Sequence, residues 1–138
     1  MGRILAIDYG KKRTGLAVTD PLKIIASALE TVETKTLKKT LVSYCAKEVV
    51  EAFVVGKPFT RDFSVNEIET EIGIFVTWLE EKFPDIKIYR VDERFTSKIA
   101  SQTILASGVN KKTRQQKEII DRVSATIILQ TFMEMKQP

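Results

Sequence analysis

Residues 3–10 read RILAIDYG, and this stretch decides how the rest of the chain is interpreted. Its apolar run is too short for a helix and ends at Tyr9 and Gly10, so it predicts a buried strand. A second strand is expected at 14–19, before Asp20 and Pro21. A third is expected at 24–32, so the chain opens with three antiparallel strands.

Beyond residue 36 the apolar residues recur at three- or four-residue spacing, which predicts a helix with its lysines on the outer side and Cys45 in the core. Capping boxes at Ser64 and Thr113 mark the starts of two later helices. The expected elements are a helix over 36–49, a strand at 52–56, a helix between 64 and 84, a strand at 86–91, a helix from about 97 to 107 and a last helix from about 113. This order predicts an α/β protein with a mixed five-stranded sheet, in which three antiparallel strands precede two parallel ones, flanked by helices.

The composition sets limits on the chemistry. With 138 residues, 43% of them hydrophobic, the chain suits a single domain over residues 1–138. No apolar run approaches the roughly 20 residues of a membrane span and no secretory leader is recognised, so we expect a cytoplasmic protein without a membrane partner. Cys45 is the sole cysteine and there is no histidine, which excludes an internal disulfide, a cysteine–histidine pair and a classical zinc site. The net charge of +4 mildly favours a polyanionic partner.

Asp8 ends a hydrocarbon strand on the same side as Ile4 and Ala6, so its carboxylate should leave the core at the carboxyl end of that strand. The alternative is a turn residue that bonds its own backbone before Gly10. Asp92 and Glu93 also follow a strand but alternate between faces, so only one can join Asp8, and the pattern leaves the choice open.

Asp121 heads an otherwise apolar stripe on the last helix, because it shares a face with Ala125, Ile128 and Phe132. The alternative is an acid favoured by the helix dipole, although Asp121 lies beyond the first turn if Thr113 is the cap. Carboxylates about 4 Å apart repel by roughly 4 kcal/mol per pair at an effective dielectric near 20. Such a cluster therefore points to a divalent cation, and oxygen-only ligands suit Mg²⁺ or Mn²⁺.

Four segments in order carry a family resemblance: DYGKKRTGLAVTD at 8–20, VGKP at 55–58, DERFTS at 92–97, and IDRVSA at 120–125 with IIL at 127–129. Together they resemble the YqgF family of Holliday junction resolvases, also described as nucleases for the 5′ end of pre-16S ribosomal RNA, over essentially the whole chain. The resemblance implies a ribonuclease H-like fold, selects Glu93 over Asp92, and makes Asp8, Glu93 and Asp121 the acidic, metal-binding cluster. The chain departs from the family at Lys57 and at Asp62-Phe63, which concerns substrate contacts more than chemistry.

Basic residues near these acids are the candidate phosphate contacts. They are Lys11, Lys12, Arg13, Lys57, Arg61, Arg94 and Lys98, with a second cluster at Lys111, Lys112 and Arg114. Aromatic side chains at Tyr9, Phe59, Phe63 and Phe95 are candidate platforms for unpaired bases.

The leading expectation is a metal-dependent nuclease that acts on structured RNA, in 5′-end processing of pre-16S rRNA. The alternatives are a Holliday junction resolvase acting on branched DNA and a non-catalytic nucleic-acid-binding module. Nucleotide binding of the actin and sugar-kinase type is disfavoured, because the chain is too short for that two-domain fold and no second phosphate motif is present. The oligomeric state stays open.

Overall fold

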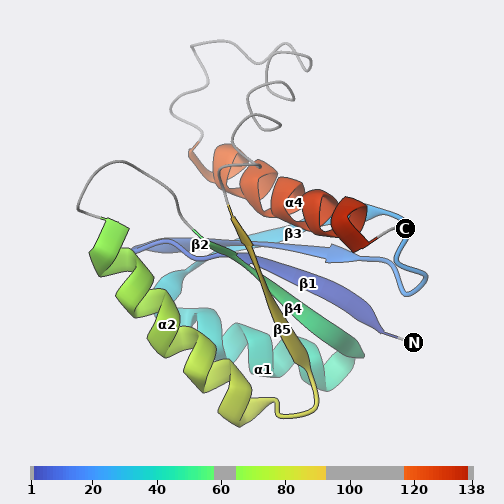
Figure 1. Cartoon of the computed structure of the whole chain (residues 1–138), viewed down its shortest axis with the longest axis horizontal. Helices are drawn as coiled ribbons and strands as arrows, with labels where there is room; N and C mark the ends of the chain where they lie inside the picture. Colours follow the sequence, from blue (N-terminus) through green and yellow to red (C-terminus); the bar gives the residue numbers. More distant parts are fainter. Residues whose placement is uncertain (1, 58–64, 93–116, 137–138) are drawn as a thin grey trace.

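The computed structural model describes residues 2–57, 65–92 and 117–136, with side chains described in these ranges except at 65–67, 117–124 and 136 (Figure 1). The elements are β1 (Arg3–Asp8), β2 (Arg13–Thr19), β3 (Ala26–Glu33), η1 (Thr34–Thr36), α1 (Leu37–Lys47), β4 (Val50–Lys57), α2 (Val65–Lys82), β5 (Lys87–Asp92) and α4 (Lys117–Lys136). No helix in these ranges is long and apolar enough to cross a membrane.

The five strands form one mixed sheet in the order β3-β2-β1-β4-β5. Strands β1, β2 and β3 pair antiparallel, whereas β4 and β5 join β1 in parallel. Ile7 lies opposite Val55, and Lys57 lies opposite Asp92, so β1, β4 and β5 end along the same edge of the sheet. The predicted mixed sheet is confirmed.

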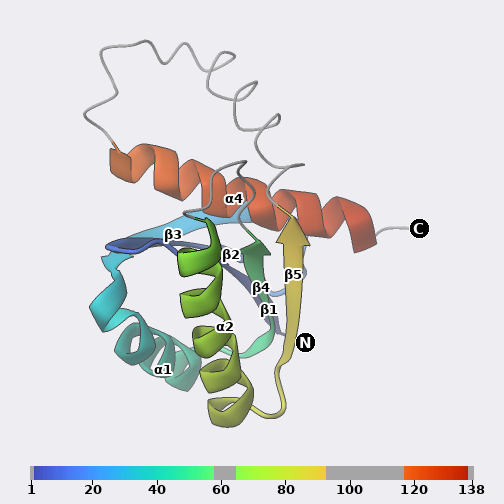
Figure 2. The same ribbon diagram turned by 60° about the vertical axis from the view of Figure 1, so that its left-hand side comes forward.

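Helices cover both faces of this sheet, which is why β1 is apolar at every interior position (Figures 1 and 2). Leu5 and Ile7 face α1 and α2, in a core with Leu41, Phe53 and Leu79. The alternate residues of the strand, Ile4 and Ala6, face α4 and form a second core there, together with Ala17, Val54, Val91, Ala125, Ile128, Leu129 and Phe132.

Three apolar positions were placed wrongly by the sequence pattern, which put Val49 on the helix and both Ile24 and Ile25 in the third strand. Helix α1 ends at Lys47 because Glu48 is extended, and Val49 is 68% exposed instead of facing inward. Ile25 is 63% exposed and precedes β3, because its backbone N–H donates to the Asp20 carboxylate and closes the β2–β3 turn. Cys45 is half-buried at the margin of the core. The helix expected at 97–107 and the caps at Ser64 and Thr113 lie outside the described residues.

Candidate active site

Asp8 is the last residue of β1 and is half-buried at the edge where the parallel strands end. Side chains alternate along a strand, so Asp8 belongs to the face of Ile4 and Ala6. Those two residues pack in the core beneath α4. Asp8 is therefore on the α4 face of the sheet, as its spacing predicts.

Asp92 lies on the other face. In β5, Val91 belongs to the core beneath α4, whereas the Arg90 guanidinium pairs with Glu69 of α2 at 3.0 Å. Asp92 follows the phase of Arg90, so alternation directs it to the α2 face, away from the face of Asp8. Glu93, the next residue, lies outside the described residues.

Asp121 belongs to the second turn of α4, and its side chain lies outside the described part of the chain. Farther along the same helix, Ala125, Ile128 and Phe132 pack against the face of the sheet that holds Ile4 and Ala6. Within the described residues, no three acidic, cysteine or histidine side chains gather closely enough to bind a metal ion. Two of the three predicted carboxylates, those of Glu93 and Asp121, belong to side chains that lie outside the described part of the chain.

The turn after Asp8 is tightly built and is braced by Thr34. A Cβ at Gly10 would run into the carbonyl oxygen of Arg13, so the turn accepts no larger residue without moving its backbone. The Thr34 hydroxyl donates to the Gly10 carbonyl at 2.7 Å and accepts from the Thr14 hydroxyl at 2.9 Å. The Thr34 amide donates to the carbonyl of Lys12 at 2.8 Å. Sequence reasoning missed Thr34, because its partners lie 20 or more residues away in the chain and no local pattern reports them.

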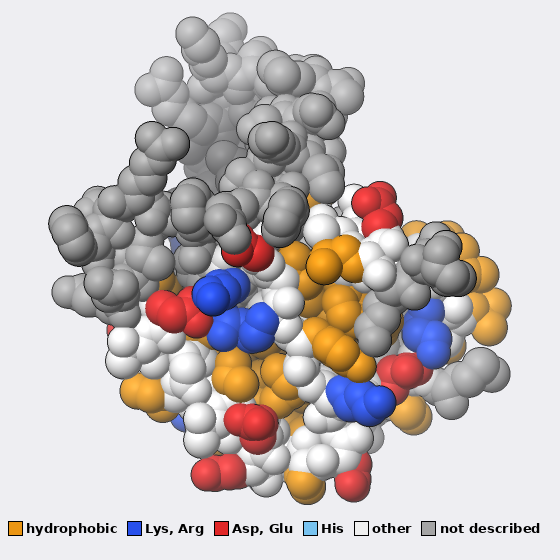
Figure 3. All heavy atoms as spheres, in the orientation of Figure 1, with side chains coloured by type: hydrophobic (Ala, Val, Ile, Leu, Met, Phe, Trp, Pro, Cys, Tyr) orange, Lys and Arg blue, Asp and Glu red, His pale blue; other side chains and the backbone are white. Residues whose placement is uncertain are grey.

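Four of the predicted phosphate-binding residues lie at the same edge as Asp8. Lys11 and Lys12 are exposed in the turn, Arg13 is half-buried at the start of β2, and Lys57 is exposed at the end of β4. The other six, Arg61, Arg94, Lys98, Lys111, Lys112 and Arg114, lie outside the described residues, as do Phe59, Phe63 and Phe95. On the face seen in Figure 3, the described basic and acidic side chains are interspersed around β5, so charge on that side is mixed.

Tyr9 is half-buried beside α2. Its ring centroid lies 5.2 Å from that of Phe75. Burial, followed by the charge of Glu71, raises the pKa of the Tyr9 hydroxyl. The Tyr9 ring thus lies, partly exposed, beside the turn that follows Asp8.

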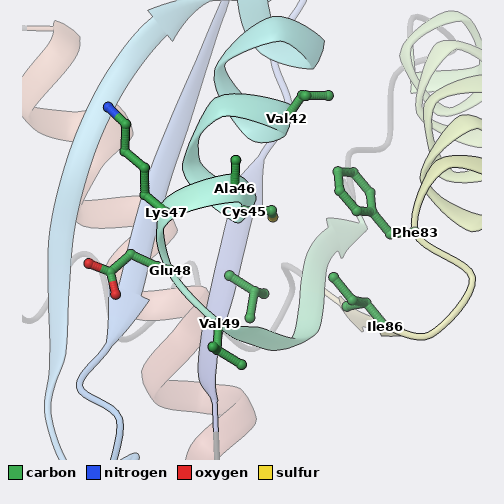
Figure 4. A pocket seen from close by; sticks show the side chains of 9 residues that line it. Val42, Cys45, Ala46, Lys47, Glu48, Val49, Phe83 and Ile86 are labelled. Atoms are coloured by element: carbon green, nitrogen blue, oxygen red, sulfur yellow. The ribbon is translucent and has the colours of Figure 1, made fainter.

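A pocket of ≈ 480 Å³ lies at the opposite end of the sheet, where β4 begins (Figure 4). Its lining is mainly apolar, with Val42, Cys45, Phe83 and Ile86 around it, while Lys47 is turned away from Phe83 and Ile86. Burial raises the pKa of the Cys45 thiol, which disfavours the nucleophilic thiolate. This pocket has neither the charge nor the position of a phosphodiester site.

A mixed sheet in this order, flanked by helices, is the ribonuclease H-like fold, and here an acid ends the central strand with basic residues along the same edge. The family model described as "RuvX: Holliday junction resolvase" matches residues 2–135, and the chain belongs to this family. It is accordingly a hydrolase acting on phosphodiester bonds.

Relatives support the assignment over the full length. A protein of Flavobacterium johnsoniae named "Putative pre-16S rRNA nuclease" is 53% identical over 137 residues, covering 99% of both chains. A protein of Porphyromonas gingivalis with the same name is 53% identical over 134 residues, covering 97% of each. Among solved structures, T. thermophilus RuvC in complex with a Holliday junction substrate has a TM-score of 0.61 at 16% identity, covering 99% of this chain and 97% of its own. At this low identity, the structural similarity supports the fold alone.

Proposed function

We propose that this nuclease is metal-dependent and acts in 5′-end processing of pre-16S rRNA, with Asp8, Glu93 and Asp121 as its catalytic carboxylates. The observation that carries the proposal is the placement of Asp8 on the α4 face, at the edge where the parallel strands end. The choice of substrate is supported by relatives named "Putative pre-16S rRNA nuclease", which align with 97–99% of this chain. The family match over residues 2–135 supports a single nuclease domain.

The periodicities of strand β5 and helix α4 support the inclusion of Glu93 and Asp121 in the same site. If the alternation of β5 continues by one residue, Glu93 takes the phase of Val91, which packs beneath α4 on the face of Asp8. Asp121 precedes Ala125 by four residues and so shares its side of α4. The three carboxylates then converge from a central strand, an edge strand and the covering helix.

The donor set fits magnesium or manganese. Three carboxylates supply only oxygen ligands, and the absence of histidine from the chain leaves no competing zinc-type ligand set. When bound, such an ion supplies a polarised water and stabilises charge on the reacting phosphate. Without a cation the clustered acids repel one another, so folding stability does not explain their presence.

The chain's own residues would position the substrate around this centre. Lys11, Lys12, Arg13 and Lys57 would bind phosphates along the strand-end edge. Thr34 holds the turn that carries the first two of these lysines and fixes their position relative to Asp8. We assign the same phosphate-binding role to Arg61, Arg94, Lys98, Lys111, Lys112 and Arg114.

Resolution of branched DNA is the second candidate, favoured by the description of the family model. The two activities are separated by offering the purified protein a precursor RNA with the 16S 5′ end and a four-way DNA junction, each with Mg²⁺ or with a chelator. We expect Mg²⁺-dependent cleavage of the RNA. Preferential cleavage of the junction would contradict the RNA assignment and favour resolution of branched DNA. Binding without cleavage of either substrate would identify a non-catalytic module.

The catalytic assignment is tested with Asp8→Asn. We expect cleavage to be abolished while the melting temperature stays unchanged or rises, because the variant removes a repulsive charge but keeps the shape of the side chain. Asp85→Asn is the matched control, since Asp85 is exposed in the turn before β5, and it should cleave normally. Retained cleavage in Asp8→Asn, or loss of cleavage together with loss of stability, contradicts the assignment.

A further inference from the structure

Two pockets are lined mainly by residues of α1 and α2, the helices on the opposite side of the sheet from α4 (Figure 2). The first, of ≈ 380 Å³, is lined by Tyr9, Lys11, Lys35, Lys38, Ile74 and Phe75, among others. The second, of ≈ 400 Å³, is lined by Lys38, Lys39, Val42, Ser43, Trp78 and Lys82. Lys38 lines both pockets, and we call their combined surface the α1–α2 groove.

The groove is strongly basic. Five of its lining residues are exposed lysines, and one is acidic, Glu71. Lys35 pairs with Glu33 at 3.2 Å, but within the described part of the chain no ion pair is seen for Lys39 or Lys82. Most of this positive charge is therefore available to an anionic partner.

The apolar surface between the lysines comes from Ile74, which is exposed, and Trp78, which is half-buried, whereas Phe75 is buried. The rings of Phe75 and Trp78 are stacked, with centroids 6.0 Å apart and an interplanar angle of 19°. The Lys38 ammonium lies 5.3 Å from the centroid of the Trp78 ring, and Ile74 is 65% exposed. Lysines around a partly exposed tryptophan and an exposed aliphatic side chain suit single-stranded nucleic acid, because phosphates can contact the charges while unpaired bases contact the Trp78 ring.

The groove starts beside the candidate active site. Tyr9 and Lys11 line its first pocket and directly follow Asp8 in the chain. Thr34 lines the same pocket and braces the turn that contains both. A strand bound at Asp8 can therefore pass over this turn and continue between the helices.

We propose that the α1–α2 groove binds the single-stranded segment of the substrate that adjoins the cleaved bond. The phosphates contact Lys38, Lys39 and Lys82, and bases pack on the surface around Ile74 and Trp78. A duplex fits less well, because its bases are stacked and paired and cannot lie on the Trp78 ring. This assignment rests on the proposed nuclease function, which it extends to the path of the substrate.

Trp78 is the only tryptophan of the chain, so its fluorescence reports directly on the groove. A single-stranded RNA of about fifteen nucleotides is titrated into the protein in the presence of a chelator, and Trp78 emission is followed together with the anisotropy of labelled RNA. We expect the RNA to quench Trp78 emission saturably, and we expect the Kd from quenching to equal the Kd from the anisotropy change. RNA binding without any change in Trp78 emission would overturn the proposal, as would equal quenching by a duplex of the same length.

A charge-matched pair of variants tests the lysines. Lys39→Gln/Lys82→Gln removes two charges inside the groove, and Lys47→Gln/Lys87→Gln removes two exposed charges outside it. Since each phosphate contact contributes about 0.7 to the salt slope for single strands, we expect the groove variant to lose about 1.4 of the slope and on the order of tenfold in affinity near 0.1 M salt. The control should bind like the parent. Equal losses in both variants would mean that only net charge matters and would exclude the groove.

The same measurements separate this proposal from the catalytic one. Asp8→Asn should quench and bind as the parent protein does, because the titration needs neither metal nor cleavage. If the parent quenches but never cleaves, the groove assignment stands and the catalytic one fails. If the parent cleaves normally but the groove variants bind and cleave unchanged, the groove assignment fails alone.

Discussion

Gly10 shows how little room the turn beside Asp8 allows. Any Cβ at this position meets the backbone oxygen of Arg13, and a backbone atom cannot yield as a flexible side chain would. The same turn is tied by its carbonyl groups to Thr34. A change at Gly10 therefore moves the chain that leads out of Asp8.

We expect Gly10→Ala to lower the free energy of unfolding by about 1–3 kcal/mol, the range for overpacked sites, and to reduce kcat for RNA cleavage. Gly73→Ala is the matched control, because a Cβ at Gly73 meets nothing within 4 Å in the middle of α2. Alanine there should raise stability by up to about 1 kcal/mol and leave cleavage unchanged. Chemical denaturation and single-turnover cleavage measure both effects, and a Gly10→Ala protein indistinguishable from its parent would show that the turn is not constrained.

The acids illustrate what the sequence can and cannot predict at this scale. The side on which Asp8 lies followed from Ile4 and Ala6 alone, since a strand has a period of two. The choice between Asp92 and Glu93 did not follow from the sequence. Ile88 and Val91 pack on opposite faces, but both are apolar, so the pattern of β5 does not indicate which residues share the face of Asp8. The phase of β5 is given by tertiary contacts, such as those of Arg90 with α2 and of Val91 with the core beneath α4.

The β2–β3 turn is an element held together by one carboxylate. The Asp20 side chain accepts hydrogen bonds from the amides of Ile25 at 2.7 Å, Ile24 at 2.8 Å and Leu22 at 3.2 Å. The bond from Ile25 is the largest cause of a lowered pKa for Asp20, and those from Ile24 and Leu22 add to it. The ionised carboxylate is thus the form that the folded turn prefers.

Because the folded pKa of Asp20 is below its unfolded value, its stabilisation is complete above the ordinary pKa of an aspartate and is lost as the pH falls through the lowered value. We expect Asp20→Asn to be less stable than the parent at neutral pH and the difference to shrink on acidification. Unfolding free energies between pH 2 and 7, with the carboxyl titration of Asp20 followed by NMR, measure this. A difference that stays constant with pH would show that the charge contributes nothing.

Helix α1 shows why the groove escaped sequence reasoning. Its lysines were predicted on the outer side, and Lys38 and Lys39 are indeed exposed. An exposed helix face becomes a binding surface only when another element lies beside it, and Trp78 is some forty residues farther along the chain. Periodicity reports the faces of one element and carries no information about which faces meet.

At the scale of the whole molecule, the α4 face depends on a few fully buried side chains. Ile128 has no exposed surface and packs in the core with Ile4 and Ala6. We expect Ile128→Ala to lower the free energy of unfolding by about 2–5 kcal/mol, through lost burial and the cavity left behind. Gln130→Ala, at an exposed position of the same helix, should change it by less than about 0.5 kcal/mol. Equal effects in thermal denaturation would mean that α4 is not packed as described.

The separation of more than 100 residues between β1 and α4 has a consequence for synthesis. The face that carries Asp8 is closed by the last helix, Lys117–Lys136, and β1 pairs with β4 across more than 40 residues of sequence. Pairings this distant form late, after the local ones. A growing chain therefore exposes the Ile4 and Ala6 surface, with its acid at the rim, until α4 has been made and has left the ribosome.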